Sequence, residues 1–435
     1  MREWVESDPV IIERGEGCHL IDTEGRRYLD GASSLWVIVH GHRKKTIDEA
    51  IKKQLDKIAH STLLGLSNVP SIELAEKLVT LAPKGLTRVF YSDDGSTAVE
   101  SALKMAFHYS KARDKNTRKE KFLAFTGAYH GDTLGGMSVG EIDVFVERYR
   151  PLLFKALRAP YPYCYRCPVK KKYPDCKIAC LDKLKDILER RGPEIAACII
   201  EPLMEGAAGM ISAPPGFLKG VRRLTEKYGV LLIADCVATG FGRTGAMFAC
   251  EHEGVSPDLM CLAKGMTGGY LPLAATLSTE RIYRAFLGTV KDPDAFYHGH
   301  TYTGNPLGCA AALANIRIFE KERVLEKMHP KVRLLERLLN EFRSLGHVGD
   351  VRQRGLMAGV ELVKDKKMKE PYPFQLRIGH RVCLSARDKG VIVRPLGDTI
   401  VIMPPLSITA GELKMLAGVI RDSIEEVTGQ EVCEE

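Results

Sequence analysis

Residues 230–269, VLLIADCVATGFGRTGAMFACEHEGVSPDLMCLAKGMTGG, are the segment most indicative of the fold. Its first five residues form an apolar run of strand length, and Asp235 follows at the carboxyl end of this run. Lys264 follows a second apolar run, residues 259–263, in the same way. Open α/β sheets bind their ligands at the carboxyl ends of their strands. We therefore expect Asp235 and Lys264 to lie at one ligand-binding edge of a sheet.

A carboxylate and an amine at such an edge support a particular chemistry. Desolvation lowers the pKa of a lysine, which makes its amine a nucleophile toward a carbonyl group. A carboxylate can keep a pyridinium nitrogen protonated, and these are the two protein groups that pyridoxal phosphate requires. The alternative is a structural ion pair between Asp235 and Lys264 without a cofactor. The motifs around them favour the cofactor.

The stretch resembles the signature of the class III (omega-type) aminotransferases, which are pyridoxal phosphate enzymes of fold type I. That signature is an apolar strand, Asp-Glu-Val, Thr-Gly-Phe-Gly-Arg-Thr-Gly and then the cofactor-linked lysine. This chain has Asp235-Cys-Val237, the full motif at residues 239–245, and Lys264. The resemblance implies that Asp235, Val237 and Lys264 bind pyridoxal phosphate. Cys236 departs from the family pattern, which usually has glutamate there.

Small residues follow the strand expected at residues 87–92, namely Gly95, Ser96 and Thr97, and a helical pattern begins with them. The free N–H groups and the dipole of a helix N-terminus bind anions. Serine and threonine there can also be simple helix caps. The resemblance implies that these three residues hold the cofactor phosphate. It also implies a homodimer in which Thr301 reaches the phosphate of the partner subunit.

The resemblance supplies candidates for the substrate pocket as well. Tyr129 follows the strand expected at residues 121–125 and matches the family's aromatic residue that stacks on the pyridine ring. Trp36, Gly299 and Tyr129 are candidate substrate contacts, and Arg394 is the candidate clamp for a substrate carboxylate. The alternatives are a buried tyrosine for Tyr129, a core aromatic for Trp36 and a surface ion pair for Arg394.

Within class III, the chain most resembles the adenosylmethionine-8-amino-7-oxononanoate aminotransferases of biotin synthesis. The segments that carry this likeness are Ser33-Ser-Leu-Trp36, Arg166-Cys-Pro168, residues 201–209, residues 250–258 and Arg394-Pro395. The implied reaction moves an amino group from S-adenosylmethionine to 8-amino-7-oxononanoate and forms 7,8-diaminononanoate. The alternative is another omega-aminotransferase with a lysine, diamine or taurine donor and a pyruvate-type acceptor.

The amino donor is the least determined feature. Relatives that accept 2-oxoglutarate often carry a glutamate a few residues after the Glu-Pro pair, which switches an arginine between substrates. Here Ala207 occupies that place, with Glu205 two residues away. The pattern therefore argues against glutamate as the donor and leaves S-adenosylmethionine and lysine open.

Four cysteines gather in one short segment, Cys164, Cys167, Cys176 and Cys180, among the twelve of the chain. The first two have the spacing of a zinc hairpin, and the other two could complete a four-thiolate site. The alternative is a surface insertion rich in proline and tyrosine that binds no metal, which we favour.

Composition excludes several classes of protein. The 435 residues are 45% hydrophobic and 27% charged, which is typical of globular proteins. The net charge of +8 is spread over lysine-rich segments such as residues 44–57, so we expect no nucleic-acid partner. No apolar run reaches the roughly 18 residues of a membrane span, and the first residues do not form a signal peptide. We expect a cytoplasmic protein that acts on small molecules away from membranes.

Strands and helices alternate from residue 87 to about residue 320, which predicts an α/β domain with a mostly parallel sheet. The resemblance implies fold type I, with a smaller α+β domain built from both chain ends. We expect residues 1–70 as an N-terminal part of the small domain, residues 71–325 as the large cofactor-binding domain and residues 326–435 as the C-terminal small domain. Trp4 is a candidate for the substrate-binding aromatic that relatives often place near the N-terminus.

Overall fold

The computed structural model describes residues 9–289 and 294–434, with the side chains of residues 430–434 excepted. Trp4 lies outside the described residues. The chain divides into two compact units, one formed by Met1–Asp48 with Glu326–Glu435 and the other by Glu49–Leu325. The three-part division expected from the sequence remains a prediction about where the domains begin and end.

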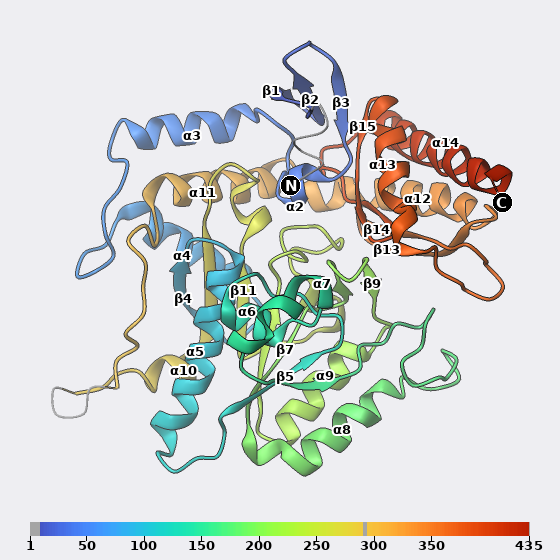
Figure 1. Cartoon of the computed structure of the whole chain (residues 1–435). Coiled ribbons are helices and arrows are strands. Elements are labelled where there is room, and N and C mark those ends of the chain that lie inside the picture. The colour runs from blue at the N-terminus through green and yellow to red at the C-terminus, as the bar shows by residue number, and fades with distance from the viewer. Residues whose placement is uncertain (1–8, 290–293, 435) are drawn as a thin grey trace. The chain divides into compact units, whose positions relative to one another are not determined.

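The larger unit contains a seven-stranded sheet (Figure 1). Its strands, in spatial order, are β4 (Leu86–Ser92), β12 (Ala274–Thr279), β11 (Leu259–Leu262), β10 (Leu231–Asp235), β7 (Ile195–Ile200), β5 (Lys121–Phe125) and β6 (Leu157–Ala159). The pairs from β11 to β6 are all parallel, whereas β12 runs antiparallel to both of its neighbours. The prediction of an α/β fold with a mostly parallel sheet is confirmed.

Helices cover both faces of this sheet. Strand residues alternate between the two faces, and one face packs against α5 (Gly95–Arg113) in a core that includes Ala102, Ile199 and Ile233. The opposite face meets α9 (Phe217–Lys227), where the rings of Phe125 and Phe217 lie 5.6 Å apart. Because both faces are buried, a central strand such as β7 is apolar throughout.

The larger unit contains further helices and strands around the sheet. They are α4 (Val69–Leu81), α6 (Leu134–Val139), α7 (Asp143–Val146), η1 (Glu147–Leu152), α8 (Cys180–Arg191), η2 (Gly192–Glu194), β8 (Met204–Glu205), β9 (Ile211–Ser212), η3 (Ala249–Glu253), η4 (Lys264–Thr267), α10 (Glu280–Arg284) and α11 (Pro306–Lys321). Helix α11 begins at Pro306, because Asn305 accepts hydrogen bonds from two N–H groups of the first turn and proline fits the first helical position.

The smaller unit is of α+β type and draws on both chain ends, as predicted. One sheet has the order β1 (Ile12–Glu16), β2 (His19–Asp22), β3 (Arg27–Asp30) and β15 (Val391–Ile392), and the other β13 (Val348–Arg354), β14 (Met357–Leu362), β17 (Thr399–Ile402) and β16 (Arg394–Leu396). Its remaining elements are α2 (Ser33–Trp36), η5 (Phe374–Leu376), α13 (Ile378–Asp388) and α14 (Ala410–Glu434). Helices α3 (Lys45–Leu55) and α12 (Val324–Phe342) span the chain positions at which the units join.

One strand of the smaller unit differs from the prediction. The sequence predicts one strand over residues 391–394, but the chain changes sheets within it. Val391 and Ile392 pair with β3, whereas Arg394 and the next two residues pair with β17. Among the helices of the described residues, none is both long enough and apolar enough to cross a membrane.

Candidate active site

Asp235 ends strand β10 in a position where only 5% of its surface is exposed. One carboxylate oxygen, Oδ2, lies 2.7 Å from Nδ1 of His130, and the other accepts the backbone N–H of Val237 at 3.1 Å. His130 is itself buried, and within the described chain its Nε2 has no hydrogen-bond partner. A buried carboxylate is costly unless it is paired. These contacts therefore hold Asp235 in one position.

Lys264 begins η4, directly beyond β11. Asp235 pairs with Cys261 in the parallel pairing of β10 with β11. Lys264 comes three residues after Cys261 along the chain. Both residues thus lie at the carboxyl edge of the sheet, as their strands predict. The backbone of Lys264 has a φ of 40°, which is unfavourable for a residue with a side chain. Such strained positions cluster at functional sites.

The start of α5 combines a helix cap with a close-packed loop. Asp94 accepts the N–H of Thr97 at 3.0 Å, and the hydroxyl of Thr97 donates back to the carbonyl of Asp94 at 2.9 Å. Thr97 is therefore a capping residue, which was the alternative interpretation from the sequence. The N–H groups of Gly95 and Ser96 lie in the first turn, where a helix supplies no acceptor. These two groups can bind an anion.

Two glycines allow the surrounding loops to approach this helix start. A Cβ on Gly95 would lie 2.7 Å from Cγ1 of Val237, and a Cβ on Gly131 would lie 2.1 Å from the hydroxyl of Ser96. Both distances are shorter than any side chain permits, so any larger residue would push the loops apart. The structure therefore brings Gly95, Ser96 and Val237 together, as the sequence predicts.

Tyr129 lies in the turn after β5 and is held at both ends. Its backbone N–H donates to Oε1 of Glu201 at 3.0 Å, and its hydroxyl donates to Asp132 at 2.9 Å. The ring is half-buried and makes an edge contact with Phe145, with 5.8 Å between the ring centres. Burial, together with the hydrogen bond to Asp132, raises the pKa of the phenol. The ring is thus a neutral, fixed surface.

Three buried groups near this edge were not predicted as site residues: His130, Glu201 and Glu205. Burial raises the pKa of Glu201 to about 7, although its two oxygens accept backbone N–H groups from Tyr129 and Gly206. Burial also raises the pKa of Glu205 well above its usual value, and the neighbouring charge of Glu201 adds to this. Glu201 ends β7 as Asp235 ends β10, so the same strand-end argument could have identified it.

The smaller unit holds Trp36 and Arg394. Residues 33–36 have φ values of 49°, 45°, 70° and 72°, so Trp36 ends a left-handed turn. Asp30 holds this turn, since its carboxylate accepts both the N–H and the hydroxyl of Ser34, at 3.0 and 2.9 Å. Trp36 is 5% exposed, and the guanidinium of Arg394 lies 5.8 Å from the centre of its ring. The two candidate substrate residues are therefore neighbours.

Gly299 and Thr301 are exposed in the loop before α11. Between them, Nδ1 of His300 lies 2.9 Å from Oδ2 of Asp93. This contact holds the loop beside the residue that precedes the cap of α5. Thr301 is therefore at the surface of its own unit.

Comparison with known proteins identifies the family. Residues 1–424 match the class-III aminotransferases. The chain belongs to this family. It is 56% identical over 429 residues to the adenosylmethionine-8-amino-7-oxononanoate aminotransferase of Nitratidesulfovibrio vulgaris, a match that covers 98% of this chain and 79% of that relative. The enzyme of the same name from Geobacter sulfurreducens is 54% identical, with 99% and 95% covered.

Solved structures agree with the family assignment. The adenosylmethionine-8-amino-7-oxononanoate aminotransferase of Methanocaldococcus jannaschii superimposes with a TM-score of 0.93 and 48% identity, over 98% of this chain and 95% of that one. An omega transaminase of Pseudomonas jessenii in complex with PMP gives a TM-score of 0.94 and 32% identity, over 99% and 95%. The predicted fold type I and the aminotransferase activity are confirmed.

This class-III aminotransferase has Cys236 beside Asp235, where the family usually has glutamate. A hydrogen bond with Cys250, together with burial, raises the pKa of the Cys236 thiol, which is therefore neutral. The backbone N–H of Cys236 donates to the carbonyl of Cys261 at 3.0 Å, so the contact between β10 and β11 continues past Asp235. A neutral thiol therefore lies beside Asp235 in place of a carboxylate.

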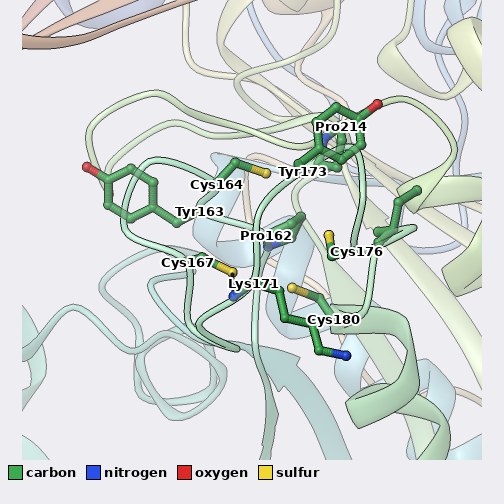
Figure 2. A pocket seen from close by; sticks show the side chains of 10 residues that line it. Pro162, Tyr163, Cys164, Cys167, Lys171, Tyr173, Cys176, Cys180 and Pro214 are labelled. Carbon is green, nitrogen blue, oxygen red and sulfur yellow. Dashed lines mark hydrogen bonds between the residues drawn. The ribbon is translucent and has the colours of Figure 1, made fainter.

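The four clustered cysteines line one narrow hollow with Tyr163, Lys171 and Pro214 (Figure 2). Cys164 is exposed and Cys180 is buried, and burial with the nearby thiols raises the pKa of Cys180 to about 12. Within residues 9–289 and 294–434, no three histidine, cysteine, aspartate or glutamate side chains are placed to hold a metal ion. The interpretation of this segment as an insertion that binds no metal stays a prediction.

Replacing Glu205 with glutamine should stabilise the protein at neutral and alkaline pH. The raised pKa means that the folded state keeps the Glu205 proton at pH values where the unfolded state has lost it. Glu205 therefore destabilises the fold increasingly as the pH rises above the unfolded pKa, near 4.3. Thermal unfolding of Glu205→Gln should show a midpoint higher by about 2–4 °C at pH 8 and unchanged near pH 4.

The matched control is Glu147→Gln, which changes an exposed glutamate. Its midpoint should follow that of the parent protein at every pH. A lower midpoint for Glu205→Gln at pH 8 would mean that Glu205 is ionised and paired in the folded state.

Proposed function

We propose that this class-III aminotransferase transfers the amino group of S-adenosylmethionine to 8-amino-7-oxononanoate and forms 7,8-diaminononanoate for biotin synthesis. The observation that carries the proposal is the 56% identity over 429 residues to a relative named for these substrates. The omega transaminases among the similar structures are 31–34% identical. The alternative of a lysine, diamine or taurine donor therefore has weaker support.

The cofactor of the proposed enzyme is pyridoxal 5'-phosphate, on which class-III aminotransferases depend. When bound, it supplies an electron sink for the negative charge that develops at the substrate carbon. The described residues fit it: a paired buried carboxylate, two first-turn N–H groups and the unpartnered Nε2 of His130 lie at one sheet edge. The residues proposed to hold it are Gly95, Ser96, Thr97, Tyr129, Asp235, Val237 and Lys264, with Thr301 of the partner subunit.

Asp235 is proposed to hold the proton on the pyridine nitrogen. Its Oδ2 is fixed by His130 and its Oδ1 by the N–H of Val237. A carboxylate held in this way in a buried site remains an effective negative charge, because little water screens it. The Tyr129 ring would lie against the face of the pyridine.

Lys264 is proposed to form the covalent link to the cofactor through Nζ. Once released from that link, the same amine would move the proton between the substrate carbon and the cofactor. Its strained backbone, with a φ of 40°, supports a position set by function and not by local preference.

Arg394, Trp36 and Gly299 are proposed to bind the substrate, with Arg394 pairing with the carboxylate of 8-amino-7-oxononanoate. Glu205 bears on the choice of donor. Burial raises the pKa of Glu205 well above its usual value, which favours the uncharged form and weakens any ion pair between Glu205 and an arginine. That property supports a site without the glutamate switch used for 2-oxoglutarate.

The proposed assembly is a homodimer, because the exposed Thr301 has a role only if the loop that carries it reaches a second subunit. A cytoplasmic location, with small-molecule substrates and no nucleic-acid or membrane partner, completes the proposal.

Substitution of Lys264 by alanine should abolish transamination while the fold persists. Without the amine, neither the covalent link nor the proton transfer can occur, so turnover should fall by about 10³-fold or more. The visible absorbance of the bound cofactor should shift to that of the free aldehyde. The matched control, Lys183→Ala, changes an exposed lysine on α8 and should leave both readouts unchanged. An unshifted band in Lys264→Ala would exclude Lys264 as the linked residue.

Mixing two inactive variants tests the shared site. Lys264→Ala and Thr301→Ala each disable a different contribution to the same active site if Thr301 acts on the partner subunit. Each heterodimer has one complete site and should therefore show about half of the activity of a parent dimer. After full exchange about half of the dimers are heterodimers, so the mixture should show about a quarter of the parent activity. Mass spectrometry of differently tagged subunits confirms the exchange. Confirmed exchange without recovered activity would exclude shared sites.

The donor is tested by half-reactions followed through the cofactor absorbance. Separate samples of the loaded enzyme receive S-adenosylmethionine, lysine, glutamate, alanine or taurine. We expect S-adenosylmethionine to react fastest, lysine more slowly and glutamate slowest. Ala207 cannot pair with an arginine, and burial, which raises the pKa of Glu205, disfavours its charged form. Glutamate as the best donor would overturn the proposed substrate while leaving the family assignment intact.

A further inference from the structure

A second polar cavity lies at the opposite edge of the large sheet. It has a volume of about 390 Å³, and its walls include Ala196, Leu231 and Asp258. The first two are at the amino ends of β7 and β10, and the third directly precedes β11. The active-site residues follow the carboxyl ends of these same strands. The cavity is therefore separated from the active site by the length of the sheet.

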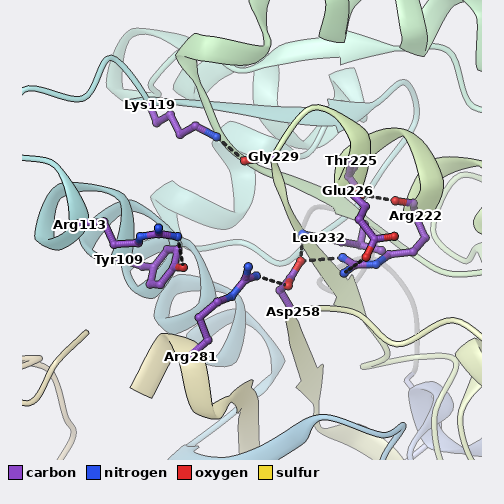
Figure 3. A network of polar contacts seen from close by, with 10 residues as sticks. All are labelled: Tyr109, Arg113, Lys119, Arg222, Thr225, Glu226, Gly229, Leu232, Asp258 and Arg281. Atoms are coloured by element: carbon purple, nitrogen blue, oxygen red, sulfur yellow. Dashed lines mark hydrogen bonds and ion pairs between the residues drawn. The ribbon is translucent and has the colours of Figure 1, made fainter. Parts of the chain in front are cut away.

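Part of the charge in this cavity is neutralised within the protein (Figure 3). Asp258, 4% exposed, lies 2.7 Å from Nη1 of Arg222 and 2.6 Å from Nη2 of Arg281, and accepts the N–H of Leu232 at 2.9 Å. Glu226 lies 3.6 Å from Arg222. Two arginines thus balance two carboxylates, and Asp258 ties them to strand β10.

Two further cationic side chains line the same cavity, and neither is neutralised by a carboxylate of the described residues. Arg113 donates to the hydroxyl of Tyr109 at 2.9 Å, and Lys119 donates to the carbonyl of Gly229 (Figure 3). Neither has a carboxylate within ion-pair distance in the portion of the chain that is described. Burial and the charge of Arg113 lower the pKa of Lys119, so both cations are close enough to repel each other.

The remaining carboxylate of the walls is Asp114. It is exposed, and its Oδ1 accepts the N–H of Asn116 at 3.0 Å, which closes a turn. Counting it, the cavity keeps one uncompensated positive charge: four cations, Arg113, Lys119, Arg222 and Arg281, against three carboxylates, Asp114, Glu226 and Asp258. A group with a negative charge between Arg113 and Lys119 would remove their repulsion and complete their hydrogen bonds.

We propose that this cavity is a binding site for a small anion whose phosphate or carboxylate group is held by Arg113 and Lys119. Its volume lies within the range of pockets for small ligands, roughly 300–1,000 Å³. The site is independent of the proposed cofactor site, since it uses other residues at the other sheet edge. A ligand that binds there stabilises the folded state, and the stabilisation grows with the logarithm of its concentration once the site is mostly occupied.

The test uses the cofactor-loaded enzyme, so that the cofactor phosphate already occupies its own site. Inorganic phosphate and succinate are titrated separately by calorimetry in a buffer of monovalent ions. Arg113→Gln and Lys119→Gln should each weaken binding by about tenfold or more, the usual effect of losing one charge-assisted hydrogen bond. Arg118→Gln is the matched control, because it removes an exposed charge outside the cavity walls. It should change the affinity by less than about twofold.

The binding measurements distinguish the class of ligand and can overturn the proposal. Binding of phosphate alone identifies a phosphoryl ligand, and binding of succinate identifies a carboxylate ligand. Equal weakening by Arg118→Gln would reduce the effect to general surface charge and overturn the proposal. Absence of saturable binding up to about 50 mM of either anion, well above a millimolar dissociation constant, would also overturn it. Transaminase activity of the variants should equal that of the parent, which verifies their folding and separates this test from that of the proposed function.

Discussion

The contact between Asp235 and His130 is the constraint on which the site depends. A carboxylate that is 5% exposed persists as a charge only where partners offset its desolvation. His130 provides that partner at 2.7 Å, and it follows β5, whereas Asp235 ends β10. Strand β7 lies between these two strands in the sheet and ends beside Glu201. The position of one charge therefore depends on three strands being in register at a common edge.

Most of the fold and part of the site could be predicted from the sequence, because both leave local signals. An apolar run that ends in a charged residue marks a strand and its active edge together, as it does for Asp235 and Lys264. The helix start at Gly95 is equally local. The partnership of His130 with Asp235 was not predicted, since it joins residues 105 positions apart through the order of strands, which no short pattern records.

Some residue types fit more than one role, and the structure shows one of these roles directly. Thr97 has the residue type of both a phosphate ligand and a helix cap. Its hydrogen bonds with Asp94 show that it caps the helix, and its contact with the cofactor phosphate stays a proposal. The four clustered cysteines have metal-site spacing, but spacing alone does not show that their side chains line one hollow. The division of residues 391–394 between two sheets was likewise invisible, because each half pairs with a segment distant in the chain.

The left-handed turn that ends at Trp36 also limits how this enzyme can change. Residues 33–36 all have φ between 45° and 72°, a conformation that costs roughly 1–2 kcal/mol per residue for ordinary side chains. Asp30 offsets part of this through its bonds to Ser34. A β-branched residue at position 36 would add to the backbone strain, whereas glycine or asparagine would relieve it. Variation at position 36, by evolution or by design, must therefore satisfy the backbone conformation of the turn before any other requirement.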